Sequence, residues 1–344
     1  MLLVWNVHHT EPQTVAPAIP WTTGRTQTVN TIAWIGIGNM GARMCSHLVK
    51  AGFTVQGYDL NPDAVATAAE HGVHPTASVA EAVAGADVVF TMLPKGQHVL
   101  SVFDGPDGVW AHADKSTLLV DSSTIDIASC RLLHERSAAQ GFRFVDAPVS
   151  GGISGAADGT LAFMMGGEAA DKSRAATFIG PMSGKIFDAG EATMGIAAKI
   201  VNNMMLCIDM LANSEGSQLA ERLGLDPKVF WEIASASSGR SWAQQTWYPV
   251  PGVIPTSAAD HNFDATFTVD LARKDVGLAL EAGKDAGINL PAAGLVSGQF
   301  DRLIEEGLAA KDCILIAKYV NPDESLRGWN PDTDSGSGSG SDAA

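Results

Sequence analysis

The chain has 344 residues, which is long for one domain and sufficient for two domains with separate hydrophobic cores. Hydrophobic residues make up 46% and charged residues 17% of it, as in ordinary globular proteins. The formal net charge of −16 argues against non-specific binding to nucleic acid or to an anionic membrane, because such binding needs basic patches. We expect neither as a partner.

The four cysteines, at positions 45, 130, 207 and 313, are scattered and show no zinc-ligand spacing. We therefore expect reduced thiols in the core, no metal site, and a cytosol-like compartment. Residues 1–29 lack the basic start and apolar length of a signal peptide, and one arginine is too few for a mitochondrial transit peptide. This favours the bacterial cytoplasm, with the mitochondrial matrix as the alternative for a eukaryotic source.

Both ends of the chain are set apart from the predicted fold. Residues 1–29 are predicted to form a flexible N-terminal extension. Residues 322–344 contain an alternation of serine and glycine that is typical of a flexible tail.

The globular part opens with a strand, a glycine turn, a helix and a second strand. Apolar residues 31–35 predict a buried strand, and residues 53–58 predict the second strand after a helix that ends near residue 51. The pattern GxGxxG occupies residues 36–41, and Asp59 follows its first glycine by 23 positions. A GxGxxG pattern alone is weak in a chain with 36 glycines, and a plain glycine turn is the alternative. The surrounding elements favour a dinucleotide-binding site.

Each residue type in this pattern has a physical role. Gly36 permits the tight turn, Gly38 lets the backbone approach a pyrophosphate, and Gly41 allows the helix to pack closely on the strand. Asp59 is expected to bind the ribose hydroxyls of the cofactor and to repel a 2′-phosphate, which favours NAD over NADP. The predicted cofactor-binding residues of this segment are Gly36, Gly38, Asn39, Met40, Gly41 and Asp59.

Strands and helices continue to alternate as far as residue 190. Further strands are predicted over residues 87–92, 117–120, 142–145, 160–166 and 185–188. Further helices are predicted over residues 63–71, 78–84, 98–103, 127–140 and 169–179. This order predicts an α/β, Rossmann-like, doubly wound and mainly parallel sheet over residues 30–190.

Ligands of such sheets bind beyond the carboxyl ends of the strands. Leu93, Pro94, Thr124 and the segment Ser150–Gly152 all follow predicted strands, so they are expected on one edge with the glycine turn. The backbone N–H groups of that last segment and the serine hydroxyl suit a small carboxylate. For Thr124, capping of the following helix is an equally good interpretation.

A long apolar helix is predicted over residues 194–220. Lys199, Asn202 and Asn203 are three and four positions apart, so they are expected on one face of this helix. Because the rest of the helix is apolar nearly all round, it is expected to be buried, and its lysine must face a cavity or a partner. The alternatives are a lysine whose ammonium reaches water and, less well supported, a transmembrane span.

After this helix, strand signals nearly vanish. Later helices are predicted over residues 227–235, 269–286, 292–306 and 311–319. The sequence thus predicts an all-helical domain over residues 191–321 that is joined to the sheet by the long helix. Substrate binding and dimerisation are implied for this domain by the family resemblance of the following motifs.

Four motifs in order resemble the β-hydroxyacid dehydrogenases. They are GxGxxG with Asp59, the segment 146–152 (DAPVSGG), the pattern GxxxKxxNN at 195–203, and Arg273-Lys274-Asp275. Within this family, segments 121–126, 237–240 and 248–252 most resemble those of 3-hydroxyisobutyrate dehydrogenases. The resemblance covers roughly residues 31–321.

The resemblance implies roles for matching residues. Lys199 corresponds to the catalytic lysine and Asn203 to the residue that orients the substrate. The carboxylate-binding turn corresponds to Ser150, Gly151 and Gly152, and the further cofactor contacts correspond to Leu93, Pro94, His98, Thr124 and Lys274. The chain departs from the family at two places, since His98 stands where asparagine is usual and Ile196 where glutamine is common. Without the resemblance, Lys274 and Asp275 would be interpreted as a surface ion pair of little energetic value.

The implied activity is NAD-dependent oxidation of 3-hydroxyisobutyrate to methylmalonate semialdehyde in valine catabolism. Lys199 is expected to act as the general base, with its pKa lowered by a closed, partly apolar cleft. Alternatives are a family member acting on tartronate semialdehyde, succinic semialdehyde or glyoxylate, and a catalytically inactive dinucleotide-binding interaction protein. A serine hydrolase is disfavoured because no GxSxG follows a strand. The resemblance also implies a homodimer or homotetramer.

Overall fold

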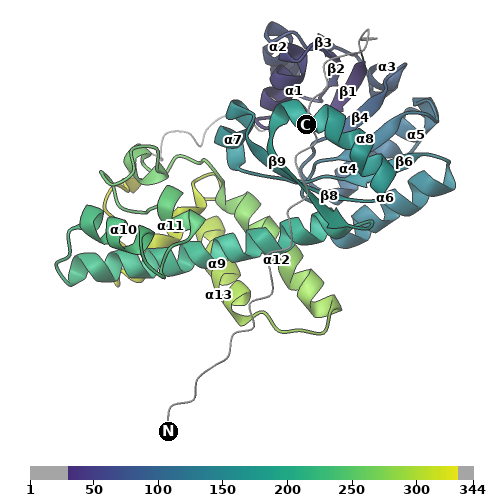
Figure 1. Ribbon diagram of the computed structural model, residues 1–344. Coiled ribbons are helices and arrows are strands. Elements are labelled where there is room, and N and C mark those ends of the chain that lie inside the picture. Colours follow the sequence, from purple (N-terminus) through teal and green to yellow (C-terminus); the bar gives the residue numbers. More distant parts are fainter. Residues whose placement is uncertain (1–29, 332–344) are drawn as a thin grey trace, which may run out of the picture.

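A mainly parallel sheet and a set of helices form the two halves of the computed structural model, which describes residues 30–331 (Figure 1). The predicted extension over residues 1–29 and the predicted tail from residue 332 lie outside the described residues. One long helix runs from the sheet half into the helical half.

The sheet has nine strands in the order β3-β2-β1-β4-β5-β6-β8-β7, with β9 paired to β8. Their bounds are β1 Thr31–Ile35, β2 Thr54–Tyr58, β3 His74–Pro75, β4 Val88–Thr91, β5 Leu118–Asp121, β6 Arg143–Asp146, β7 Val149–Ser150, β8 Leu161–Gly166 and β9 Ser183–Gly190. Strands β1 to β6 are parallel, whereas β8 is antiparallel to β6 and β7. The prediction of a doubly wound, mainly parallel sheet is confirmed.

Strand β1 pairs with β2 on one side and with β4 on the other, so the strand order reverses at this point. A reversal of this kind opens a crevice at the carboxyl ends of the two strands, where open α/β sheets bind their ligands. The glycine turn follows β1 directly and therefore lies at this crevice.

Helices cover both faces of the sheet (Figure 1). They are α1 Gly41–Lys50, α2 Pro62–Glu70, α3 Val79–Val83, α4 Gly96–Phe103, α5 Val109–His112, α6 Ile127–Ala139, α7 Gly152–Asp158 and α8 Ala169–Ile179, followed by the 3₁₀ turn η1 Gly180–Met182. The central strands are buried on both sides because alternate residues enter different cores: Ile32 and Trp34 join one cluster, and Ala33 and Ile35 join the other.

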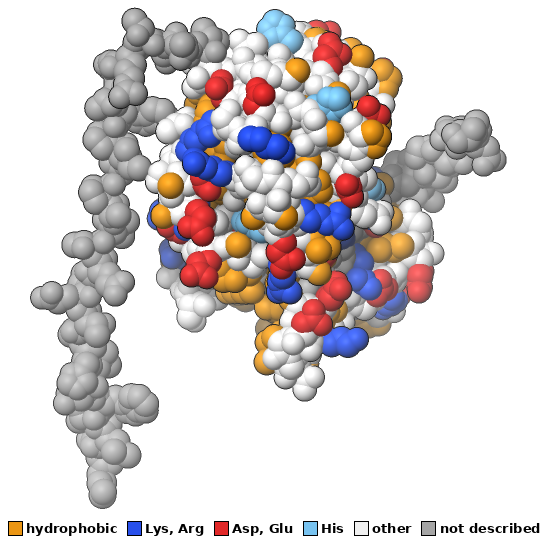
Figure 2. All heavy atoms as spheres, turned by 90° about the vertical axis from the view of Figure 1, so that its right-hand side faces the viewer, with side chains coloured by type: hydrophobic (Ala, Val, Ile, Leu, Met, Phe, Trp, Pro, Cys, Tyr) orange, Lys and Arg blue, Asp and Glu red, His pale blue; other side chains and the backbone are white. Residues whose placement is uncertain are grey.

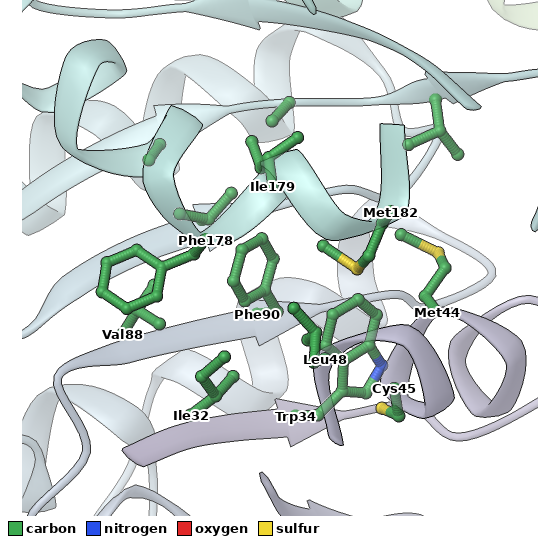
Figure 3. Packing of buried hydrophobic residues seen from close by; sticks show 14 of the residues in the cluster. Ile32, Trp34, Met44, Cys45, Leu48, Val88, Phe90, Phe178, Ile179 and Met182 are labelled. Carbon is green, nitrogen blue, oxygen red and sulfur yellow. The ribbon is translucent and has the colours of Figure 1, made fainter. Parts of the chain in front are cut away.

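The first of these clusters contains a pair of stacked aromatic rings (Figure 3). Trp34 of β1 and Phe90 of β4 are register partners, and their ring centroids lie 5.0 Å apart with an interplanar angle of 16°. Leu48 from α1 and Phe178 from α8 belong to the same cluster. This packing fixes the two strands that flank the crevice.

The helical half begins with α9 Met194–Arg222 and continues with shorter helices. These are α10 Pro227–Ser235, α11 Trp242–Thr246, the 3₁₀ turn η2 Ala258–His261, α12 Val269–Asp285, α13 Pro291–Glu305 and the 3₁₀ helix η3 Cys313–Val320. The predicted α-helix over residues 311–319 is thus a 3₁₀ helix. Asp312 caps its start, since its carboxylate accepts hydrogen bonds from the N–H groups of Ile314 (3.1 Å) and Thr266 (2.8 Å).

Helix α9 belongs to both cores. Ile196 and Ile200 pack in a cluster of the sheet half, and Cys207 and Met210 pack in the cluster of the helical half. Among the described residues, α9 is the one helix that is long and apolar enough to cross a membrane by length and composition.

The tail prediction is wrong for residues 322–331. Leu326 is 6% exposed and belongs to the core of the helical half. Trp329 packs against that core, with its ring edge-on to Phe263 at a centroid distance of 6.3 Å. The folded part therefore extends beyond residue 321, because two large apolar side chains in a polar segment find a binding surface that sequence periodicity does not reveal.

Candidate active site

Lys199 lies in the second turn of α9, and its side chain faces the interior. The residue is 8% exposed, so its ammonium does not extend into bulk water. Burial lowers the pKa of Lys199 to about 8, while the negative charge of Asp275 opposes this shift and the positive charge of Lys274 adds to it. The expected lowered pKa is therefore confirmed, and burial is its main cause.

Asn203 follows Lys199 by one helical turn and is 4% exposed. Its side-chain Nδ2 donates a hydrogen bond of 2.6 Å to Oδ2 of Asp275 on α12. Asn202 was expected on the same face but is exposed, because three residues rotate the helix by less than a full turn. Its Nδ2 donates to the Asn203 Oδ1 at 3.1 Å, so it touches the site only at its rim.

Lys274 connects the helical half to the edge of the sheet. Its Nζ donates hydrogen bonds to the backbone oxygens of Thr124 (2.9 Å) and Pro94 (3.1 Å). It also lies 3.2 Å from Oδ1 of Asp275, an atom that makes no hydrogen bond in the described structure. Asp275 is 4% exposed, so the pair is not the surface ion pair considered as the alternative. These contacts bring three predicted cofactor residues together.

A second network orders the strand ends beneath these contacts. The buried Asp121, at the end of β5, accepts hydrogen bonds from the hydroxyls of Ser123 (2.6 Å) and Thr91 (2.7 Å). The Ser123 hydroxyl oxygen in turn accepts a 2.8 Å bond from the N–H of Leu93. Burial raises the pKa of Asp121 to about 6, against the opposing effect of these hydrogen bonds. The network fixes Leu93 at the crevice.

The glycine turn has the shape of a cradle for phosphate. Gly36 has φ of 98°, and a Cβ placed on it would lie 2.3 Å from the backbone oxygen of Met92. A Cβ on Gly38 would meet nothing within 4 Å, so open space adjoins the backbone there. Helix α1 begins after Met40, which makes no side-chain cap hydrogen bond, so its first N–H groups can serve an anion.

Asp59 stands beside this turn at the end of β2. Its Oδ2 accepts a hydrogen bond of 2.7 Å from the N–H of Ile37, and its Oδ1 accepts one of 2.8 Å from the N–H of Asn61. The carboxylate is thereby tied to the loop that follows β1. The turn, the uncapped helix start and this acid together fit a dinucleotide.

The remaining predicted residues are less closely connected. Ser150 lies on β7 opposite Ala162 of β8, and Gly151 and Gly152, with φ of 128° and 66°, lead into the short helix α7. Among the described residues, no hydrogen bond joins this turn to Lys199 or Asn203. His98 lies in the first turn of α4, partly buried.

A cavity of about 410 Å³ lies beside the contacts of Lys274, where α4, the start of α6 and α12 meet. It shares Thr124 and Lys274 with the predicted cofactor residues but does not include Lys199. It is lined by Lys95, Gly96, Gln97, Leu100, Thr124, Ile125, Asp126, Ser129, Lys274, Leu278 and Glu281.

Comparison with known proteins identifies the family of the chain. Residues 31–190 match the family described as the NAD-binding domain of 6-phosphogluconate dehydrogenase. Residues 193–320 match the family described as NAD-binding of NADP-dependent 3-hydroxyisobutyrate dehydrogenase. The chain belongs to the β-hydroxyacid dehydrogenase family. This dehydrogenase is an NAD-dependent oxidoreductase.

Three relatives illustrate the similarity. A probable 3-hydroxyisobutyrate dehydrogenase of Mycobacterium tuberculosis is 44% identical over 263 residues, which is 76% of this chain and 88% of the relative. An NAD-dependent L-serine dehydrogenase of Pseudomonas aeruginosa is 38% identical, covering 85% of this chain and 98% of the relative. The solved structure of the Mycobacterium tuberculosis 3-hydroxyisobutyrate dehydrogenase with L-serine has a TM-score of 0.79 at 41% identity, covering 85% of this chain and 99% of that one.

The contacts within this β-hydroxyacid dehydrogenase also identify residues that the sequence pattern did not assign. Asp275 holds Asn203, and Asp121 orders Leu93, although both acids stand within motifs already noted in the sequence. The structure also brings Cys130, His134 and Asp146 within 4.8 Å of one another, in a chain where no metal site was expected. Both carboxylate oxygens of Asp146 already accept backbone hydrogen bonds, so this carboxylate anchors the start of α9.

Proposed function

We propose that the protein oxidises 3-hydroxyisobutyrate to methylmalonate semialdehyde with NAD⁺, as a step of valine catabolism. The observation that carries the proposal is a buried lysine with a lowered pKa, one helical turn from an asparagine that a buried carboxylate holds in place. The names of the relatives in Mycobacterium tuberculosis support the substrate class.

Different residues of the chain have different roles in the proposed reaction. When bound, NAD⁺ supplies the acceptor for the hydride of the alcohol carbon. Lys199 takes the hydroxyl proton in its neutral form, which a pKa of about 8 makes accessible near physiological pH. Asn203 directs its amide at the substrate, and the hydrogen bond to Asp275 limits its rotation. A proton transfer of this kind contributes about 10²–10⁴-fold to the rate.

The substrate carboxylate is assigned to Ser150, Gly151 and Gly152. Their backbone conformation, with positive φ at both glycines, leads into the start of α7, where N–H groups lack helical partners. Binding there leaves the hydroxyl end of a 3-hydroxy acid free to reach Lys199. The cofactor contacts are assigned to the glycine turn and to the strand ends held by Lys274.

The preference for NAD over NADP is assigned to Asp59. A carboxylate that is already fixed by two backbone N–H groups cannot turn away from a 2′-phosphate. It retains free lone pairs for the ribose hydroxyls. This arrangement disfavours NADP by like-charge repulsion and favours NAD by hydrogen bonding.

L-Serine is a second candidate substrate. It shares the carboxylate and the primary alcohol of 3-hydroxyisobutyrate and carries an ammonium in place of a methyl group. The Pseudomonas aeruginosa relative is named as an L-serine dehydrogenase, and the Mycobacterium tuberculosis structure was solved with L-serine, so both favour testing this amino acid.

Two further functions are alternatives to the oxidation of these substrates. The first is reduction of tartronate semialdehyde, succinic semialdehyde or glyoxylate by the same site. The second is a catalytically inactive, dinucleotide-binding interaction protein, which the buried Lys199 disfavours because burial of an amine without a use for it is costly.

The test is NADH formation, measured as initial rates with 3-hydroxyisobutyrate, L-serine, glycerate, 4-hydroxybutyrate and 6-phosphogluconate. We expect 3-hydroxyisobutyrate to give the highest kcat/KM, and Lys199→Met to bind NADH but lose turnover. A higher kcat/KM with L-serine would reassign the substrate. The absence of turnover with every compound would favour the inactive, dinucleotide-binding role.

We also infer a homodimer or homotetramer. Large apolar residues are exposed along one face of α9, at spacings that correspond to whole helical turns. They are Met194, Val201, Met205 and Leu219, followed by Leu223 directly after the helix. Lys199 and Asn203 lie on roughly the opposite side, so a second copy can cover the apolar face without blocking the site.

Other partners and the compartment follow from charge and cysteine state. On the face shown in Figure 2, basic side chains are interspersed with acidic ones rather than gathered into a patch. With a net charge of −16, this supports the expectation that neither nucleic acid nor an anionic membrane surface is a partner. All four cysteines are free and buried, which supports a reducing compartment such as the proposed bacterial cytoplasm or the alternative mitochondrial matrix.

A further inference from the structure

The first turn of α9 is held by a carboxylate from the sheet instead of its own cap residue. Thr193, which precedes the helix, has φ of 72° and makes no side-chain cap hydrogen bond. Asp146, at the end of β6, accepts bonds from the N–H groups of Thr193 (3.0 Å) and Ile196 (2.9 Å). Asp146 is 1% exposed. It therefore satisfies helix-start donors and places a negative charge at the positive end of the helix dipole.

A histidine from the neighbouring helix α6 orients this carboxylate. Nε2 of His134 lies 2.7 Å from Oδ1 of Asp146, the oxygen that also accepts from Thr193. Since an ionised carboxylate only accepts hydrogen bonds, Nε2 carries the hydrogen. The ring of His134 packs edge-on against Phe144, with centroids 4.7 Å apart. Asp146 is thus bonded to α6 and to two positions of α9.

Two glycines let α9 approach the sheet at backbone distance. A Cβ on Gly195 would lie 2.3 Å from the backbone oxygen of Met164 and 2.8 Å from Oδ2 of Asp146. A Cβ on Gly166 would lie 2.6 Å from Oδ1 of Asp146 and 2.7 Å from the N–H nitrogen of Gly195. No side chain fits at either position. The start of the helix can therefore neither shift along its axis nor rotate about it.

Asp146, His134, Gly166 and Gly195 together form a clamp on the start of α9. This clamp lies close to Lys199 along the helix. Ile196, whose N–H binds Asp146, precedes Lys199 by three positions, less than one turn. A helix is rigid over this distance, so any displacement of its first turn moves Lys199 by a similar amount. Misplacement of a catalytic group by about 1 Å costs on the order of 10²-fold in rate.

We propose that Asp146 and His134 are positioning residues for Lys199, and that they fix the first turn of α9 so that the amine faces the crevice. The inference rests on the proposed role of Lys199 as the general base. Cys130 lies beside the pair, but both oxygens of Asp146 are already engaged, so the cluster works as a hydrogen-bonded anchor.

The proposal is tested with variants that weaken the clamp in different ways. Asp146→Asn replaces one acceptor oxygen by a donor that faces backbone N–H groups. His134→Leu removes the donor, whereas His134→Gln retains an N–H at the side-chain end. Gly195→Ala inserts a methyl group against the strand. Gly298→Ala is the matched control, since a Cβ at this helical position meets nothing within 4 Å.

Two measurements report on the position of Lys199. The first is kcat for the hydroxy acid that the wild type oxidises fastest, with NADH affinity followed by fluorescence. The second is the pKa of Lys199 from the ¹³Cε NMR signal of lysine-labelled protein, assigned with Lys199→Met. The titratable groups that act on Lys199, namely Asp275 and Lys274 on α12 and the thiol of Cys207 on α9, are the same in all variants.

We expect Asp146→Asn, His134→Leu and Gly195→Ala to lower kcat by roughly 10- to 100-fold without changing NADH affinity. The pKa of Lys199 should rise toward the ordinary lysine value, because a displaced helix start admits water. His134→Gln and Gly298→Ala should resemble the wild type. If Asp146→Asn does not fold, the comparison of His134→Leu with His134→Gln tests the proposal. The His134 side chain is partly exposed, so these two variants are expected to fold.

A merely structural clamp would give lower melting temperatures with unchanged kcat per folded enzyme and an unchanged pKa of Lys199, and this result would overturn the proposal. The proposed function can fail separately. The wild type could lack turnover on every hydroxy acid while the pKa of Lys199 still rises in the variants. This result would support the positioning role of Asp146 and His134 and rule out the proposed reaction.

Discussion

Asn203 on α9 donates a hydrogen bond of 2.6 Å to Asp275 on α12, across 72 positions of the chain. The bond joins the helix that carries Lys199 to the helix that carries Lys274. Lys274 in turn bonds the backbone at the ends of two sheet strands. One buried carboxylate therefore connects Asn203, the helix of the proposed general base and the edge of the sheet where the cofactor is proposed to bind.

Asp275→Asn should shift the pH profile of oxidation to lower pH. The negative charge of Asp275 stabilises the ammonium of Lys199 and raises its pKa, while burial lowers it to about 8. Without this charge, the lowering effects of burial and of Lys274 outweigh the smaller raising effect of Cys207, so the midpoint of kcat/KM should fall below about 8. KM for the hydroxy acid should rise because the hydrogen bond that holds Asn203 loses its charged acceptor. The measurement is kcat/KM from about pH 5 to about pH 10, a range that brackets the pKa of the base.

Asp285→Asn is the control for this prediction. It makes the same change on the same helix at an exposed position. Its profile should match that of the wild type. A midpoint in Asp275→Asn that stays in place or moves upward would show that the carboxylate does not act on Lys199.

In the wild type, the two directions of the reaction should respond oppositely to pH. Oxidation needs neutral Lys199, so kcat/KM should rise with pH and level off above about 8. Reduction of the semialdehyde needs the ammonium, so its rate should fall through the same pH. Lys199→Arg keeps the charge but cannot give up its proton, and it should lose about 10²–10⁴-fold in both directions. Lys284→Arg, at an exposed site, should have no effect.

Much of this fold follows from the sequence, because the central strands are buried on both faces and appear as short apolar runs. The run at 31–35 and the helix at 194–222 were predicted to within two residues for this reason. Strands β3 and β7 were missed because each has two residues and is defined by its neighbours in the sheet rather than by its own pattern.

Helical spacing alone predicts the part of the candidate site whose residues are close in sequence. Lys199 and Asn203 share a helical face, so their proximity follows from spacing alone. The roles of Asp275 and Asp146 depend on partners dozens of positions away, and no periodicity indicates such pairs. The burial of Leu326 was missed for the same reason, since the other buried members of its cluster lie at earlier positions in the chain.

Alanine at Gly36 and at Gly38 should have different consequences. At Gly36 an added Cβ would lie 2.3 Å from the Met92 oxygen, in a backbone conformation that side chains avoid. Gly36→Ala should therefore lower the melting temperature. At Gly38 the added Cβ meets no protein atom within 4 Å, so Gly38→Ala should fold normally but weaken NADH binding by filling the cradle. Thermal unfolding and NADH titration separate the two effects, and unchanged NADH affinity in Gly38→Ala would place the pyrophosphate elsewhere.

Asp59→Ser should relax the preference for NAD. Loss of a charged acceptor for the ribose hydroxyls costs about 1.5–3 kcal/mol, which corresponds to roughly 10- to 100-fold in kcat/KM with NAD⁺. Use of NADP⁺ should improve because the repelling charge is gone. Asp63→Ser, an exposed acid at the start of α2, is the control. A selectivity ratio that does not change in Asp59→Ser would exclude this carboxylate as the selector.

The apolar face of α9 should be covered by a second copy of the chain. A glutamate at Val201 or Met205 would place a charge in the middle of that face, where burial without a partner is costly. Val201→Glu and Met205→Glu should therefore elute from a sizing column at a smaller mass than the wild type. Leu132→Glu introduces the same charge at an exposed leucine of α6, and it should not change the mass. A wild type that is monomeric at micromolar concentration, or variants that keep its larger mass, would leave this face without an assembly role.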